Sequence, residues 1–139
     1  MGLNCISSYV PWILHEEKEG EFNFSGNLDL SAFLDLCAEK GLYVFIRPGP
    51  YIMAEMKKEG IPFWVSEKYP DALPVGFHDE RRECNTLDYL HEGYLSTCQG
   101  WYREVMKIIV PGCRATAAAS SAFSLTTKSA CSTGCRITR

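Results

Sequence analysis

The last part of the chain, from Pro111 to Arg139, contains no aspartate and no glutamate. It has few large apolar residues and consists mostly of alanine, serine, threonine, cysteine and glycine, with four basic residues. A segment of this composition buries too little apolar surface to offset the entropy lost on folding. We therefore predict a folded domain over residues 1–110 and a low-complexity, disordered tail over 111–139.

Other features are also missing, and each absence argues against a class of protein. No apolar run approaches about 18 residues, so we predict no transmembrane helix and no membrane partner. No basic region precedes an apolar stretch at the N-terminus, which predicts no signal peptide and a cytoplasmic location. The net charge of −3 and the lack of a basic stripe argue against a nucleic-acid partner. The seven cysteines lack C-x-x-C spacing, and the adjacent His15 and Glu16 form no defined ligand set, so we expect no metal site.

Hydrophobic periodicity predicts that strands and helices alternate in the first part of the chain. A strand, a helix capped by Gly41 and a second strand form a βαβ unit, which favours a parallel sheet. The expected elements are a strand at 3–10, a loop at 11–27, a helix at 29–40, a strand at 42–47, a long loop at 48–91 with short helices near 55–60 and 62–68, and a helix at 92–109. The apolar stripe of the last helix comprises Leu95, Cys98, Tyr102, Val105, Met106 and Ile109.

The segment Arg47–Glu55 follows an apolar run that is typical of a strand buried on both faces. Two prolines and a glycine end the strand, and an aromatic residue and a carboxylate come next. This order is typical of a sugar-binding loop at the C-terminal end of a barrel strand. The residues alone also allow a rigid strand exit with Glu55 as a solvated loop residue. Trp12 and Trp64 leave a similar choice open, because each can stack on a sugar or pack in a core.

Short motifs occur in one order and at one spacing over the first half of the chain. They are Gly2–Asn4, Tyr9–Trp12, His15–Glu16, Phe22–Gly26, Gly41–Val44, Arg47–Glu55 and Gly60–Trp64. In order and spacing they resemble the glycoside hydrolase family 35 β-galactosidases, strongly over residues 1–75 and weakly over 76–110. The resemblance implies an α/β fold, an incomplete (β/α)₈ TIM barrel with two to three parallel strands, because a complete barrel takes about 250 residues. It also implies hydrolysis of terminal non-reducing β-D-galactosyl residues with retention, a β-galactoside as the partner, and no cofactor.

The resemblance assigns roles to individual residues as well. Glu55 matches the family's loop glutamate that binds galactose hydroxyls, and Tyr9 matches a tyrosine that lines the same pocket. Met53 departs from the cysteine or asparagine that is usual at its position, which puts a polar contact there in doubt. The Ala54 backbone could still donate a hydrogen bond to the sugar. These four are the expected substrate-binding residues, and no residue of the chain matches the family's two catalytic carboxylates.

The missing acid/base glutamate suggests a hypothesis about the reading frame. In the family, a helix like 92–109 leads into a strand that ends in Asn-Glu, and this glutamate is the acid/base. Read one base out of register with freely chosen synonymous codons, the segment from Pro111 onward can encode a helix end, a glycine turn, a largely apolar strand and Asn-Glu. We therefore hypothesise a one-base frameshift just after Pro111, which sequencing of the coding DNA tests. Met1 matches an internal methionine of the family, so we expect the chain to hold the second and third barrel strands.

The sequence leaves three interpretations open. The chain is part of a retaining β-galactosidase and is itself inactive, or it is a non-catalytic gene remnant or weak galactoside-binding fragment, or it belongs to another retaining barrel glycosidase such as a family 42 relative. The coding DNA after Pro111 separates the first two interpretations, and the substrate profile of a full-length homologue separates the third. No sequence pattern indicates the oligomeric state.

Overall fold

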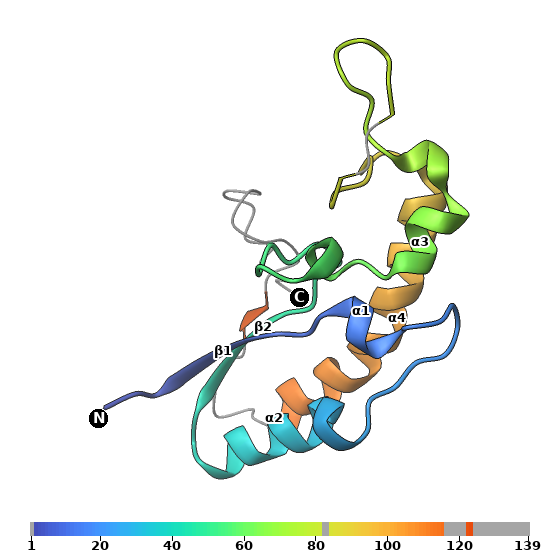
Figure 1. Ribbon diagram of the computed structural model, residues 1–139. Coiled ribbons are helices and arrows are strands. Elements are labelled where there is room, and N and C mark those ends of the chain that lie inside the picture. The colour runs from blue at the N-terminus through green and yellow to red at the C-terminus, as the bar shows by residue number, and fades with distance from the viewer. Residues whose placement is uncertain (1, 82–83, 116–121, 124–139) are drawn as a thin grey trace.

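The computed structural model describes residues 2–81, 84–115 and 122–123 and shows an α/β fold (Figure 1). The strands are β1 (Cys5–Tyr9), β2 (Tyr43–Arg47) and β3 (Ala122–Phe123). The α-helices are α1 (Trp12–His15), α2 (Leu30–Glu39), α3 (Phe63–Lys68) and α4 (Glu92–Ala115). Short 3-10 helices are η1 (Gly26–Leu28), η2 (Lys57–Gly60) and η3 (Pro70–Ala72). The expected strands and the helices at 29–40, 62–68 and 92–109 are confirmed, with boundaries shifted by a few residues. The helix expected near 55–60 appears only as the 3-10 segment η2, in which Lys58 and Glu59 have left-handed φ. The helix α1 and the 3-10 segment η1 in the predicted loop at 11–27, and the 3-10 segment η3, are additional.

The sheet is parallel, as the βαβ pattern predicts. β1 pairs with β2 in a register that runs from Cys5 opposite Tyr43 to Tyr9 opposite Arg47, and β3 pairs in parallel on the other side of β2. The crossover helix α2 begins where the Asp29 carboxylate accepts a hydrogen bond from the Ala32 amide at 2.9 Å. It ends at Glu39, and Gly41 just beyond the cap residue Lys40 has a positive φ of 65° that allows the chain to turn into β2.

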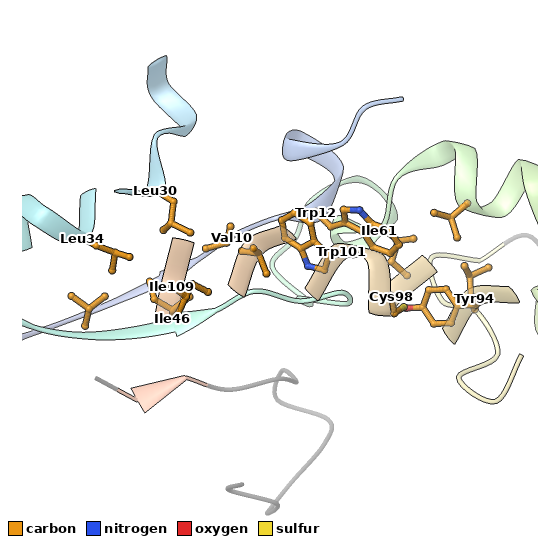
Figure 2. Packing of buried hydrophobic residues seen from close by; sticks show 14 of the residues in the cluster. Val10, Trp12, Leu30, Leu34, Ile46, Ile61, Tyr94, Cys98, Trp101 and Ile109 are labelled. Carbon is orange, nitrogen blue, oxygen red and sulfur yellow. The ribbon is translucent and has the colours of Figure 1, made fainter. Parts of the chain in front are cut away.

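Helices α2 and α4 cover one face of the sheet (Figure 1). Val44 and Ile46 of β2 are each 2% exposed and belong to a buried cluster with residues of both helices, as Figure 2 shows for Ile46 beside Ile109. On the other face Tyr43 is 39% exposed and Phe45 is half-buried. The prediction that this strand is buried on both faces is therefore wrong for the described chain, since no described element packs over the second face.

Helix α4 is longer than predicted, and its buried side agrees only in part with the predicted stripe, of which Cys98, Val105 and Ile109 are buried. It continues through Pro111 to Ala115, so its last residues lie within the predicted tail. A proline inside a helix removes one backbone hydrogen bond but does not necessarily end the helix. β3 also lies within the predicted tail, while residues 116–121 and 124–139 lie outside the described part of the chain. The buried side includes Tyr94 and Trp101, which the predicted stripe omits, and leaves Leu95 43% exposed.

Two further findings apply to the described residues. No helix among them combines the length and the apolar character that crossing a membrane requires. Nor do they contain a group of three or more histidine, cysteine, aspartate or glutamate side chains placed to hold a metal ion. His15 and Glu16 instead lie in the hydrophobic interior, where each is 4% exposed.

The burial of His15 predicts a pH dependence of stability. Its ring stacks on Phe24 at 4.7 Å and its Nδ1 lies 2.8 Å from the carbonyl oxygen of Asn23. Burial lowers the pKa of His15 below its usual 6.5, although the Asn23 hydrogen bond acts in the opposite direction. Because the folded-state pKa is depressed, the stability that neutral His15 contributes is present above about pH 6.5 and is lost as the pH falls through the folded pKa.

We therefore expect the free energy of unfolding to fall as the pH is lowered from 7.5 to about 5.5, and this slope to be shallower in His15→Phe. Phenylalanine keeps the ring stack but does not titrate. Pulse proteolysis in urea measures the unfolded fraction at low protein concentration. The exposed His78 provides the control, because His78→Gln should keep the wild-type slope. Equal slopes for wild type and His15→Phe would contradict this prediction.

Candidate functional site

The C-terminal ends of β1 and β2 bring Tyr9 and Arg47 together. The two residues are register partners, so their side chains lie on the same face of the sheet, opposite to the helices. Nη1 of Arg47 donates a hydrogen bond to the Tyr9 hydroxyl oxygen at 3.0 Å, and the guanidinium carbon lies 5.1 Å from the Tyr9 ring centroid. The sequence assigned a role to Tyr9 and none to Arg47, because the pairing depends on the register of two strands that are 38 residues apart.

Helix α4 fixes the chain where it leaves β2. Nε1 of Trp101 donates a hydrogen bond to the carbonyl oxygen of Pro48 at 2.6 Å, and the Tyr102 hydroxyl donates to the carbonyl oxygen of Gly49. The peptide bond between Gly49 and Pro50 is cis. Two neighbouring side chains of one helix therefore hold both carbonyls of the strand exit.

The loop that follows closes around Ile52, which is fully buried. The Ile52 amide donates a hydrogen bond to the carbonyl oxygen of Glu59 at 2.9 Å, which joins the two ends of the loop. Gly49 and Gly60 flank the side chain with φ of 80° and 88°. A Cβ at Gly60 would lie 2.8 Å from Cγ1 of Ile52, so this position excludes any larger residue unless the loop shifts. The loop is thus shaped by packing on Ile52, which agrees with a rigid strand exit as well as with a sugar-binding loop.

The three predicted sugar-binding residues of this loop lie next to Ile52. Met53 and Glu55 have left-handed φ of 46° and 51°, which is uncommon for residues other than glycine. Met53 is 44% exposed, Glu55 is exposed and Ala54 is half-buried. In the described part of the chain no hydrogen bond or ion pair joins Glu55 to Tyr9. The structure therefore places these residues after the same sheet edge as Tyr9, without a direct contact between the loop carboxylate and the tyrosine.

The same loop contains a strained residue that predicts a stabilising substitution. Glu59 has a φ of 48°, and its Oε2 is buried without a hydrogen-bond partner. Glycine at this position removes the left-handed strain, worth about 1–2 kcal/mol, and the cost of a buried unpaired oxygen, worth about 1–3 kcal/mol. Glycine's greater entropy in the unfolded chain offsets about 0.5–1 kcal/mol of this gain.

We expect Glu59→Gly to raise the free energy of unfolding by about 1–4 kcal/mol. The matched control is Lys58→Gly, which relieves a φ of 50° at the neighbouring residue but leaves the buried carboxylate in place. It should therefore stabilise the chain by less than Glu59→Gly does. Urea unfolding measures both variants, and a Glu59→Gly chain less stable than wild type would disprove the strain argument.

A surface groove of about 570 Å³ lies close to the loop but does not include the predicted site residues. Its lining residues are Ile13, Leu14, Glu17, Met56, Lys57 and Phe63, from α1, η2 and α3 and the residues beside them. Tyr9 instead lies on the face of the sheet that no described element covers, and Met53, Ala54 and Glu55 belong to the loop after β2. None of these four residues lines the groove.

Trp12 is a core residue and not an exposed sugar platform. It is fully buried and stacks on Trp101 with ring centroids 6.1 Å apart (Figure 2). It also makes an edge contact with Trp64 at 5.9 Å. Its Nε1 donates to the Glu16 carboxylate at 2.5 Å, and the Gly20 amide donates to the same carboxylate at 2.8 Å. Burial raises the pKa of Glu16, and these two hydrogen bonds act in the opposite direction. Glu16 therefore supports the packing of α1 and does not face the site.

Comparison with known proteins identifies the family. The sequence model described as glycosyl hydrolases family 35 matches residues 1–118. An exo-beta-D-glucosaminidase of Pyrococcus horikoshii is 43% identical over 115 residues, which are 78% of this chain and 15% of that protein. Beta-galactosidase-1-like protein 2 of Homo sapiens is 58% identical over 64 residues, covering 46% of this chain and 10% of that protein. Beta-galactosidase 13 of Arabidopsis thaliana is 42% identical over 104 residues, covering 71% of this chain and 12% of that protein.

These matches confirm the resemblance that the motifs indicated. The matched part corresponds to 10–15% of the length of these three relatives. The family match exceeds half of the chain, and its residues include β1, β2 and the loop that follows β2. The chain belongs to glycosyl hydrolases family 35.

Proposed function

We propose that residues 1–110 are part of the catalytic (β/α)₈ barrel of a retaining β-galactosidase and form one side of its sugar-binding site. The observation that carries this proposal is the register pairing of Tyr9 with Arg47 at the C-terminal ends of two parallel strands, directly before the loop with Glu55. Active sites of this fold gather at that end of the strands. The open face of the sheet also supports it, because parallel sheets are covered on both faces and a closed barrel would cover this one.

In this function the chain binds the sugar and does not perform the bond cleavage. The Glu55 carboxylate accepts hydrogen bonds from two galactose hydroxyls, while the Ala54 amide and the Tyr9 hydroxyl donate to sugar oxygens. Met53 provides an apolar contact in place of a polar one. Retaining hydrolysis needs two carboxyl groups about 5–5.5 Å apart, one as nucleophile and one as acid/base. By the family resemblance neither is present here, and the reaction itself needs no cofactor.

A second candidate function differs in the sugar. The Pyrococcus horikoshii relative is named an exo-beta-D-glucosaminidase, and its 43% identity extends over 78% of this chain. A β-glucosaminide differs from a β-galactoside in the amino group at C2 and in the orientation of the C4 hydroxyl. The substrate preference of a full-length, frame-restored version, assayed with both nitrophenyl glycosides, distinguishes the two functions.

We expect the 139-residue chain to show no turnover of a chromogenic β-galactoside, because positioning without the two catalytic carboxylates leaves little rate enhancement. The chain is produced in a host without its own β-galactosidase, in parallel with a Glu55→Gln variant. Activity that is equal in both preparations comes from a contaminant. Turnover by the wild-type chain that Glu55→Gln abolishes would overturn the expectation.

A further inference from the structure

We propose that Arg47 is a positioning residue that fixes the direction of the Tyr9 hydroxyl for the sugar, an inference that rests on the sugar-binding role proposed for Tyr9. Arg47 ends β2 on the face that the helices leave uncovered and is half-buried. Its Nη1 donates to the Tyr9 hydroxyl oxygen at 3.0 Å. In the described part of the chain, none of the ion pairs involves Arg47, so its charge is not held by a carboxylate there.

Two aromatic rings hold the guanidinium in place. Its central carbon lies 5.1 Å from the ring centroid of Tyr9 and 5.3 Å from that of Phe45, both within the range of a cation–π contact. Phe45 precedes Arg47 by two residues on the same strand face, and Tyr9 is the partner across the strand pair. An arginine suits this position better than a lysine, because its planar group stacks on rings while its edge donates hydrogen bonds.

The geometry determines what the tyrosine hydroxyl can do. Its oxygen accepts from Arg47, so its own hydrogen must point away from the guanidinium. This leaves one hydroxyl donor with a restricted direction at the C-terminal end of the strands, where the sugar would lie. A donor that is already oriented loses less freedom when the sugar binds, which favours affinity.

The test uses the full chain with ¹³C-labelled tyrosine rings and NMR. Tyr9→Phe identifies the Tyr9 signal, and the signals of the buried Tyr94 report whether the core is intact. In Arg47→Gln we expect the Tyr9 ring signal to move toward that of a solvent-exposed tyrosine while the Tyr94 signal stays unchanged. Arg47→Lys should restore part of the shift, and Arg103→Gln, an exposed arginine on α4, should leave Tyr9 unchanged. If Arg47→Gln also shifts Tyr94, Phe45→Leu replaces it as the test, because it removes one ring from the guanidinium and retains the charge.

Binding of methyl β-D-galactoside to the same chain completes the test. We expect Arg47→Gln and Tyr9→Phe each to weaken binding by roughly 2- to 12-fold, the effect of one hydrogen bond. The double variant should bind the galactoside as tightly as whichever single variant has the lower affinity. An unchanged Tyr9 signal in Arg47→Gln, or additive losses in the double variant, would overturn the positioning role. A shifted Tyr9 signal in a chain whose galactoside binding does not depend on Tyr9 would refute the proposed sugar site and leave the Arg47–Tyr9 orientation established.

Discussion

Trp101→Ala is expected to lower the free energy of unfolding by about 3–5 kcal/mol, the usual cost of replacing a buried aromatic residue with alanine. Trp101 is fully buried, and its ring stacks on those of Trp12 and Phe24 at 6.1 Å. It also donates the hydrogen bond to the Pro48 carbonyl oxygen at 2.6 Å. The substitution therefore removes core packing and releases the strand exit that shapes the candidate site.

Two variants separate these contributions. Trp101→Phe retains much of the ring but leaves the Pro48 carbonyl without its donor, for an expected cost of about 1–3 kcal/mol. Gln99→Ala on the exposed side of the same helix should change stability by no more than about 0.5 kcal/mol. Urea unfolding by pulse proteolysis measures all three at low protein concentration. A loss below about 1.5 kcal/mol for Trp101→Ala would show that this tryptophan does not join α4 to the sheet as the structure indicates.

Glu55→Gln is expected to reduce catalytic efficiency by roughly 10- to 200-fold in a full-length family 35 β-galactosidase that contains this segment. Glutamine preserves the size of the side chain but removes the charge of the acceptor, and a hydrogen bond to a charged group contributes about 1.5–3 kcal/mol. Glu17→Gln is the matched control, because Glu17 is an exposed carboxylate beside the surface groove and not in the predicted site. Its catalytic efficiency should equal that of the wild type.

The proposed role of Glu55 as a binding residue and not a nucleophile has its own test. In Glu55→Ala, added azide should not restore activity, since azide replaces a missing nucleophilic carboxylate and not a group that binds hydroxyls. Recovery of activity with formation of the inverted glycosyl azide would identify Glu55 as the nucleophile. That outcome would require a new assignment of every role at this site.

The local elements could be predicted from the sequence because their signals lie within a few residues of one another. The helix Leu30–Glu39 is preceded by the capping residue Asp29 and followed closely by Gly41. The strand Tyr43–Arg47 is followed directly by a proline. The parallel pairing followed from the order of strand, helix and strand. The motifs that carry the family resemblance are equally local, which is why the family membership could be inferred from residue order alone.

The contacts between distant residues were decided by the tertiary structure. The bond from Trp101 to Pro48 joins positions 53 residues apart, and the bond from Arg47 to Tyr9 joins positions 38 residues apart. Periodicity identifies an apolar stripe on a helix but does not fix which side faces the sheet, so Tyr94 and Trp101 were missed. The choice between core packing and sugar stacking for Trp12 was likewise decided by its neighbours. The sequence by itself determined the elements and the family, because these depend on local patterns, whereas the orientation of the site residues depends on strand register and helix packing, which arise when the chain folds.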